Sequence, residues 1–120
     1  METSRSILVI GRPGQLRDSL LVLLKAVPRI GRVEQADDVS SALTMSREIR
    51  PALVLVDHDR LGDEASNRVR AAWPQARYVA LVDSEQACHD AESAGADAAL
   101  VKGVRADRLL ATIEDLLLDW

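Results

Sequence analysis

Short apolar runs alternate along this chain with longer stretches in which apolar residues recur at every third or fourth position. The short runs are rich in Val, Ile, Leu and Ala and are bounded by glycine, proline or charged residues, which is typical of strands. They predict strands at 6–10, 32–36, 52–56, 77–82 and 98–101. The run at 52–56, ALVLV, is apolar on both faces. It therefore predicts a central parallel strand that is covered by helices on each side.

The stretches between these runs predict helices, because their apolar residues fall at helical spacing. The predicted helices cover 15–27, a segment that begins near Asp38 or Ser40 and ends at Ile49, then 64–73, a segment after Ser84 that ends at Ser93, and 106–118. Asp38 or Ser40 can cap the second helix and Ser84 the fourth. Such regular alternation predicts an α/β fold, a three-layer α/β/α sandwich around a parallel sheet with right-handed crossovers. We expect residues 1–120 to form a single domain.

Composition narrows the class of protein. The net charge is -4, from 15 basic and 19 acidic side chains, and no basic stripe stands out, so we expect no direct contact with nucleic acid. Cys88 is the single cysteine, which excludes an internal disulfide and a multi-cysteine zinc site. No apolar run approaches the ~20 residues of a membrane span, and the N-terminal run is too short for a signal peptide. We expect a cytoplasmic protein without a membrane partner.

Polar residues follow the predicted strands at the edge of the sheet where α/β folds bind ligands. Gly11 and Arg12 follow the first strand, Asp57 to Asp59 the third, Asp83 and Ser84 the fourth, and Lys102 the fifth. We expect Asp57, Asp83, Lys102 and Arg12 to face one shallow pocket, and Asp59 and Ser84 complete the candidate set. A carboxylate at a strand end with a lysine reaching over it suits the handling of a phosphoryl group.

The segments PALVLVDHDRLGDEA around Asp57 and GADAALVKG around Lys102 resemble the receiver domains of two-component response regulators, and the resemblance covers essentially the whole chain. It implies a flavodoxin-like fold with strand order 2-1-3-4-5. It also implies that Asp57 is the phosphoacceptor and that Lys102 contacts the phosphate. The partners that it implies are proteins: a histidine kinase, an output domain or another signalling protein.

The chain also departs from the family's pattern. Receiver domains place two adjacent acids after the first strand to hold a divalent cation, and this chain has Gly11 and Arg12 there. Asp83 replaces the family's hydroxyl residue, and Ala99 replaces its aromatic residue in the fifth strand. We therefore expect a degenerate, or pseudo-receiver, domain in which Arg12 and Lys102 hold Asp57. It would bind no Mg²⁺ or other cofactor, would not be an enzyme, and would act through protein–protein contacts.

Three alternatives stay open at this point. The first is a working phosphorelay receiver that uses Mg²⁺ and is phosphorylated on Asp57. The second is a metal site built from Asp57, Asp59 and Asp83, against which the nearby cationic side chains compete. The third is a nucleotide- or phosphate-binding module that uses the loop 11–14, GRPG, at the start of the first helix.

Two further expectations concern side chains away from the pocket. His58 is expected to alternate away from it and to lie on the surface as a lone histidine. The last helix carries more apolar residues than one buried stripe requires. Leu110, Leu118 and Trp120 are therefore candidates for a homodimer or docking surface.

Overall fold

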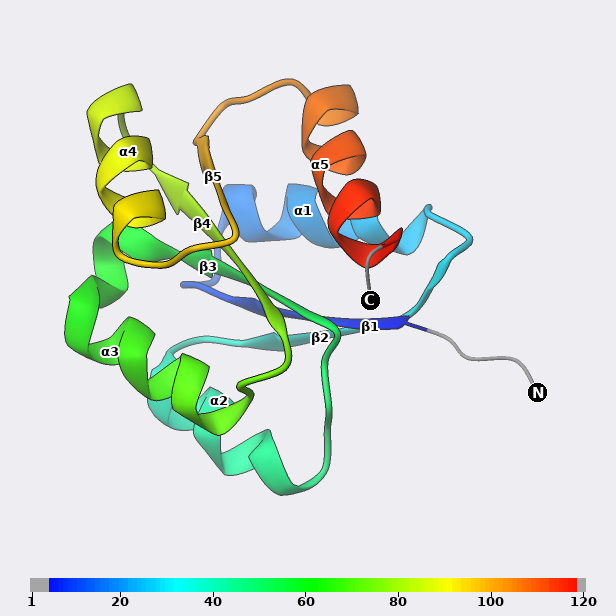
Figure 1. The fold of residues 1–120 in the computed structure, drawn as a ribbon. Coiled ribbons are helices and arrows are strands. Elements are labelled where there is room, and N and C mark those ends of the chain that lie inside the picture. The colour runs from blue at the N-terminus through cyan, green and yellow to red at the C-terminus, as the bar shows by residue number, and fades with distance from the viewer. Residues whose placement is uncertain (1–4, 119–120) are drawn as a thin grey trace.

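A parallel sheet with the strand order β2-β1-β3-β4-β5 forms the middle layer of the protein (Figure 1). The strands are β1 (Arg5–Ile10), β2 (Ile30–Ala36), β3 (Leu53–Asp57), β4 (Arg77–Val82) and β5 (Ala98–Val101). Every neighbouring pair is parallel. The computed structural model describes residues 5–118, and the side chains of all of them except residues 5, 47, 60, 61 and 63. The predicted fold class and strand order are confirmed.

Helices cover both faces of this sheet (Figure 1). They are α1 (Gln15–Lys25), α2 (Val39–Thr44) with the short 3-10 helix η1 (Met45–Arg47), α3 (His58–Ala72), α4 (Glu85–Ser93) and α5 (Ala106–Leu118). Both predicted caps are present, because Asp38 accepts a hydrogen bond from the Ser41 amide and Ser84 accepts one from the Ala87 amide. None of the helices within 5–118 has the length and apolar character needed to cross a membrane.

Helix α3 begins at His58, earlier than the predicted start at residue 64. Its first turn is separated from the rest by Gly62, whose backbone has φ 79° and ψ 175°. This is a left-handed conformation that glycine adopts without a steric cost. The interruption hides the first turn from a search for continuous helical spacing, because the turn and the main helix do not share one periodic stripe.

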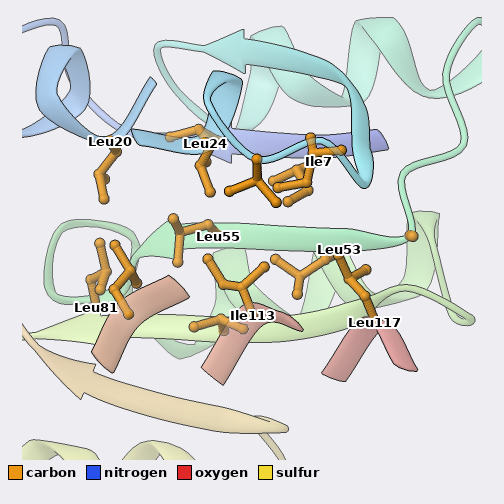
Figure 2. Packing of buried hydrophobic residues seen from close by; sticks show 14 of the residues in the cluster. Ile7, Leu20, Leu24, Leu53, Leu55, Leu81, Ile113 and Leu117 are labelled. Carbon is orange, nitrogen blue, oxygen red and sulfur yellow. The ribbon is translucent and has the colours of Figure 1, made fainter. Parts of the chain in front are cut away.

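The alternation of side chains along the strands divides the apolar core in two. On one face of the sheet, Ile7, Leu53 and Leu55 pack against the apolar sides of α1 and α5, as Figure 2 shows. On the other face, Leu8 and Val56 belong to a second cluster that is covered by α2, α3 and α4. The strands β1, β3 and β4 are buried on both faces, as the continuous apolar runs predicted.

Candidate functional site

A depression of about 700 Å³ lies at the carboxyl edge of the sheet. Its lining consists of Gly11, Arg12, Pro13, Asp37, Asp38, Asp57, Asp59, Asp83 and Lys102. The structure therefore brings together the predicted residues from the ends of β1, β3, β4 and β5. It adds two aspartates from the end of β2, Asp37 and Asp38. The sequence carried a signal for them, since parallel strands place all their carboxyl ends at one edge.

Lys102 lies at the centre of the acidic side chains. Its Nζ atom is 2.8 Å from Asp57 Oδ1, 3.3 Å from Asp83 Oδ1 and 3.7 Å from Asp59 Oδ2. Burial alone would lower the pKa of Lys102, but hydrogen bonds to Asp57 and Asp83 and the charges of these carboxylates outweigh burial and raise it. The lysine backbone is fixed by a 2.7 Å hydrogen bond from its amide to the Val82 carbonyl. The ammonium group therefore remains charged among the carboxylates.

Asp59 and Asp83 form a close pair of carboxyl groups beside this lysine. Partial burial raises the pKa of Asp59, and the hydrogen bond and negative charge of Asp83 raise it further, whereas the charge of Lys102 acts in the opposite direction. The negative charge of one carboxylate disfavours the ionised form of a carboxyl group beside it. This side of the pocket therefore resists the approach of further negative charge.

Arg12 does not have the role that the sequence predicted. Its side chain is exposed at the rim of the pocket and forms no ion pair with any residue in the described part of the chain. The position that faces Asp57 is Gly11, where a Cβ atom would lie 3.5 Å from the Asp57 Cβ atom. The interpretation of Arg12 as a fixed substitute for the missing cation is therefore wrong. The prediction was based on the position of Arg12 directly after the first strand, and a side chain in that loop need not face the pocket.

A different arginine, Arg17 on the first turn of α1, holds this corner of the pocket. Its Nη1 atom donates to the Gly11 carbonyl at 3.2 Å and pairs with the Asp37 carboxylate. The side chain is only 12% exposed, so it is a structural part of the edge. The sequence offered one signal for this role: a basic residue in the first turn of a helix that starts directly behind the strand-end loop.

Asp38 and Ser84 serve as helix caps. Asp38 accepts a 2.8 Å hydrogen bond from the Ser41 amide, and this bond lowers the pKa of Asp38. Ser84 accepts a hydrogen bond from the Ala87 amide at 3.1 Å and is not part of the pocket lining. The prediction of Ser84 as a pocket residue is wrong, because the requirement of α4 for a cap directs its hydroxyl away.

The residues present do not fit a divalent cation. The end of β1 supplies no carboxylate, since Gly11 and Arg12 stand there, and the Lys102 ammonium group occupies the space between Asp57, Asp59 and Asp83. Mg²⁺ needs near-octahedral oxygen ligands and competes poorly with a fixed ammonium. Among the residues that the structure describes, no group of three or more His, Cys, Asp or Glu side chains is placed to hold a metal ion. The alternative metal site built from the three aspartates is therefore contradicted.

The loop 11–14 borders the pocket and contributes Gly14 as the N-cap residue of α1. Its neighbours at the edge of the sheet include the carboxylates of Asp37, Asp38 and Asp57. This electrostatic environment is unfavourable for a phosphate or nucleotide, because like charges would lie at close range.

Outside the pocket, two predictions about side chains need correction. His58 is half-buried, and its Nδ1 atom lies within hydrogen-bond distance of Ser66 and Tyr78, so it is not a surface histidine. Leu110 packs against the core cluster of α1 and α5, whereas Leu118 is 62% exposed. Trp120 lies outside the described residues.

No family model and no curated protein matches the sequence, but solved structures match the fold. A LuxR family DNA-binding response regulator from Silicibacter pomeroyi is 22% identical with a TM-score of 0.81, and the match covers 96% of this chain and 93% of that one. The signal receiver domain of a DNA-binding response regulator from Colwellia psychrerythraea 34H is 19% identical with a TM-score of 0.81, over 95% and 98% of the two chains.

A third match comes from the complex between the P1 domain of CheA3 and CheY6 of R. sphaeroides. It is 19% identical with a TM-score of 0.81, over 98% of this chain and 99% of that chain. Identity at this level shows the fold alone. The chain therefore has the CheY-like fold of response-regulator receiver domains.

Proposed function

We propose that this protein is a receiver-type signalling domain that acts by protein–protein contact, without Mg²⁺-dependent phosphorylation. One observation carries the proposal: the Lys102 ammonium group is already paired with the pocket's own carboxylates, at 2.8 Å from Asp57 and 3.3 Å from Asp83. The cation that would pair with an incoming phosphoryl group is thus engaged with carboxylates that belong to the fold.

The charges around Asp57 support the same conclusion. A phosphoryl group on Asp57 would bring about two negative charges to a pocket that already contains Asp59 and Asp83. Without a metal ion, Lys102 would have to neutralise the phosphoryl group and both acids together. The domain therefore turns over no substrate, and its surface carries its function.

Protein partners follow from the fold's relatives. The similar solved structures are DNA-binding response regulators and a complex between the P1 domain of CheA3 and CheY6. By analogy, the partner of this domain is a histidine kinase, an output domain or another signalling protein. A homodimer that uses the exposed Leu118 at the end of α5 belongs to the same class of contact.

A second candidate function is phosphorylation of Asp57 itself. The observation that favours it is the placement of the Asp57 carboxylate at the end of β3, in the lining of the open depression. In that reaction an Asp57 oxygen would attack the phosphorus of a donor, the bond from phosphorus to the leaving group would break, and an acyl phosphate would remain on the aspartate.

Intact-mass measurement after incubation with acetyl phosphate, with and without Mg²⁺, separates the two functions. We expect no phosphoryl adduct on the parent protein in either condition. The Asp57→Asn variant identifies any reaction at this residue, and Asp18→Asn on α1 serves as a matched control for nonspecific modification. A phosphoryl adduct that requires Mg²⁺, is lost in Asp57→Asn and is released by hydroxylamine would overturn the proposal in favour of the second candidate.

A further inference from the structure

Strand β2 is one of the two outermost strands of the sheet. In the part of the chain that the structure describes, β1 is its only neighbour in the sheet. An outermost strand presents backbone N–H and C=O groups that no neighbouring strand satisfies. The other outermost strand, β5, has four residues, whereas β2 has seven. β2 is therefore the longer edge, with room for another strand of similar length.

The backbone groups of β2 point alternately toward β1 and away from it. The Ala36 carbonyl accepts a 3.0 Å hydrogen bond from the amide of Gly11, the residue that directly follows β1. Because alternate residues of a strand share one direction, Val33 and Gln35 direct their N–H and C=O groups outward. Gly31 is the extra residue of a bulge near the start of the strand. Val33 and Gln35 therefore offer two donors and two acceptors to a further strand.

The side chains of this edge carry opposite charges on one face. Arg32 and Glu34 are two positions apart and so share a face of the sheet, and Arg32 Nε lies 3.3 Å from Glu34 Oε2. Val33, between them, packs on the opposite face against the core beneath α1 and α5. The arginine side chain is 70% exposed and the glutamate side chain 27%, so both remain accessible. A strand that pairs with β2 must match this order of charges.

A second copy of β2 matches the order in antiparallel orientation, when the two Val33 residues lie opposite each other. Arg32 of each strand then lies opposite Glu34 of the other, in the close, non-hydrogen-bonded positions of the ladder. A shift of two residues would place either the two arginines or the two glutamates opposite each other, which is destabilising. A shift of one residue would turn the side chains to the wrong faces. The charges therefore favour a single register.

Charged residues and bulges on an outermost strand also protect it from pairing with other strands. An apolar strand placed on β2 would remove water from Arg32 and Glu34 without supplying charges to replace it. A second copy of β2 supplies those charges, because each side chain meets its opposite. The edge therefore excludes strands in general and accepts its own copy.

We propose that two copies of this chain associate through their β2 strands, which pair in antiparallel orientation with Val33 at the two-fold axis. The two sheets then form one continuous sheet. A contact in which each copy uses the same surface closes on itself, so it produces dimers and not filaments. The antiparallel arrangement points the two Asp57 pockets in opposite directions, and both stay open. The proposal does not depend on whether Asp57 is phosphorylated, and the surface is separate from Leu118.

Sedimentation velocity of the full chain, at concentrations from about 1 µM to 1 mM, measures the association. We expect a monomer–dimer equilibrium for the parent protein. Arg32→Glu places glutamate opposite glutamate in both pairs, and Glu34→Arg places arginine opposite arginine. Each substitution should therefore weaken the dimer by about tenfold or more. Arg29→Glu, which makes the same change of net charge just before β2, is the matched control and should leave the association unchanged.

An equimolar mixture of Arg32→Glu and Glu34→Arg is the decisive sample. In a mixed dimer both cross-strand pairs are again of opposite charge, so the mixture should associate as strongly as the parent while each variant alone stays weak. General attraction does not explain such a result, because each substitution changes the net charge of -4 by two units and both variants remain negative. The double variant Arg32→Glu/Glu34→Arg should dimerise by itself. Circular dichroism shows that each variant is folded.

Oxidative cross-linking tests the register. In a Cys88→Ser background, which removes the protein's single cysteine, Arg32→Cys and Glu34→Cys are oxidised separately and together. Opposite residues at a non-hydrogen-bonded position have Cα atoms about 4.5 Å apart, within the range of a disulfide. We expect cross-linked dimers in the mixture and few in either variant alone. Equal cross-linking in all three samples would overturn the register.

Four results would overturn the proposal as a whole. The first is a parent protein that stays monomeric up to about 1 mM. The second is an association that survives both charge reversals. The third is a mixture of the two folded variants that stays as weak as each variant alone. The fourth is loss of association in Leu118→Ser, which would assign the dimer to α5 instead of β2.

Discussion

Lys102 and Asp57 are joined across the carboxyl edge of the sheet, with Nζ and Oδ1 2.8 Å apart and both side chains mostly buried, at 23% and 14% exposed. The two residues come from the ends of β5 and β3, which are separated in the sheet by β4. Their contact spans the end of the intervening strand. It is the ion pair whose removal should affect the molecule most clearly.

Lys102→Met should destabilise the protein by about 1–3 kcal/mol at neutral pH, because Asp57, Asp59 and Asp83 then repel one another without a cation between them. Urea denaturation measures the change. The raised pKa of Lys102 means that its contribution is fully present below the unfolded pKa and is lost as the pH rises through the folded pKa. Lys25→Met, on the exposed side of α1, should change stability by less than about 0.5 kcal/mol. Equal losses in the two variants would contradict the arrangement.

Asp59→Asn should raise the melting temperature at neutral pH by roughly 2–4 °C. The folded-state pKa of Asp59 is raised, chiefly by burial and then by Asp83. Its favourable contribution is therefore present below the unfolded pKa, near 3.8, and is lost as the pH rises through the folded pKa. Asparagine imitates the protonated form, so the advantage over the parent should disappear in acid. Melting curves across this range check the sign, and Asp90→Asn on the exposed side of α4 is the control.

Arg17→Met should cost about 1–2 kcal/mol, because it removes the donor to the Gly11 carbonyl and the partner of Asp37 from a largely buried position. Arg12→Met should change stability by less than about 0.5 kcal/mol, since that side chain is exposed and without an ion pair in the described part of the chain. Chemical denaturation of the two variants side by side makes the comparison. The reverse order of effects would restore Arg12 to the role that the sequence predicted.

Gly11→Asp combined with Arg12→Asp should give Mg²⁺ binding that is stronger than that of the parent protein. A side chain at position 11 faces Asp57, with its Cβ atom in ordinary contact at 3.5 Å, so the new carboxylate can share a ligand with it. Mg²⁺ at a hundred times its Kd would add about 2.7 kcal/mol of stability to the variant, which thermal melting detects.

The matched control for this gain is Gly11→Asn, which has the same shape without the charge. Of the two single substitutions, Gly11→Asp should contribute more of the affinity than Arg12→Asp, because position 12 lies at the rim. A larger effect from Arg12→Asp would show that the geometry around Asp57 is different from that described.

The strands were predictable because they depend on short-range patterns, whereas their order was implied by the resemblance to receiver domains. A run such as ALVLV, which is apolar on both faces, is typical of a strand that helices cover on both sides. The sequence therefore indicated a central position for β3. The predicted bounds of β4, β5 and α5 agree with the structure. The kink at Gly62 was not predictable in this way. A single glycine within a polar stretch can mark either an interruption of the helix or an ordinary helical position.

The candidate site was only partly predictable. Asp57 and Lys102 stand at strand ends, where the fold itself fixes their direction, and both lie in the pocket. Arg12 stands in a loop and Ser84 at the start of a helix. The directions of their side chains depend on the local backbone conformation, which the alternation of side chains along a strand does not predict. His58 was misread because its partners, Ser66 and Tyr78, are 8 and 20 residues away in sequence and meet it only after folding.

The sheet also acts as a partition. Ile7 and Val9 contribute to the core beneath α1 and α5, while Leu8 and Ile10 contribute to the core beneath α2, α3 and α4. A combinatorial library that replaces the apolar residues of α1 and α5 would leave the opposite half of the molecule physically untouched. The residues of the two core clusters can therefore be changed independently of each other, in evolution or by protein design.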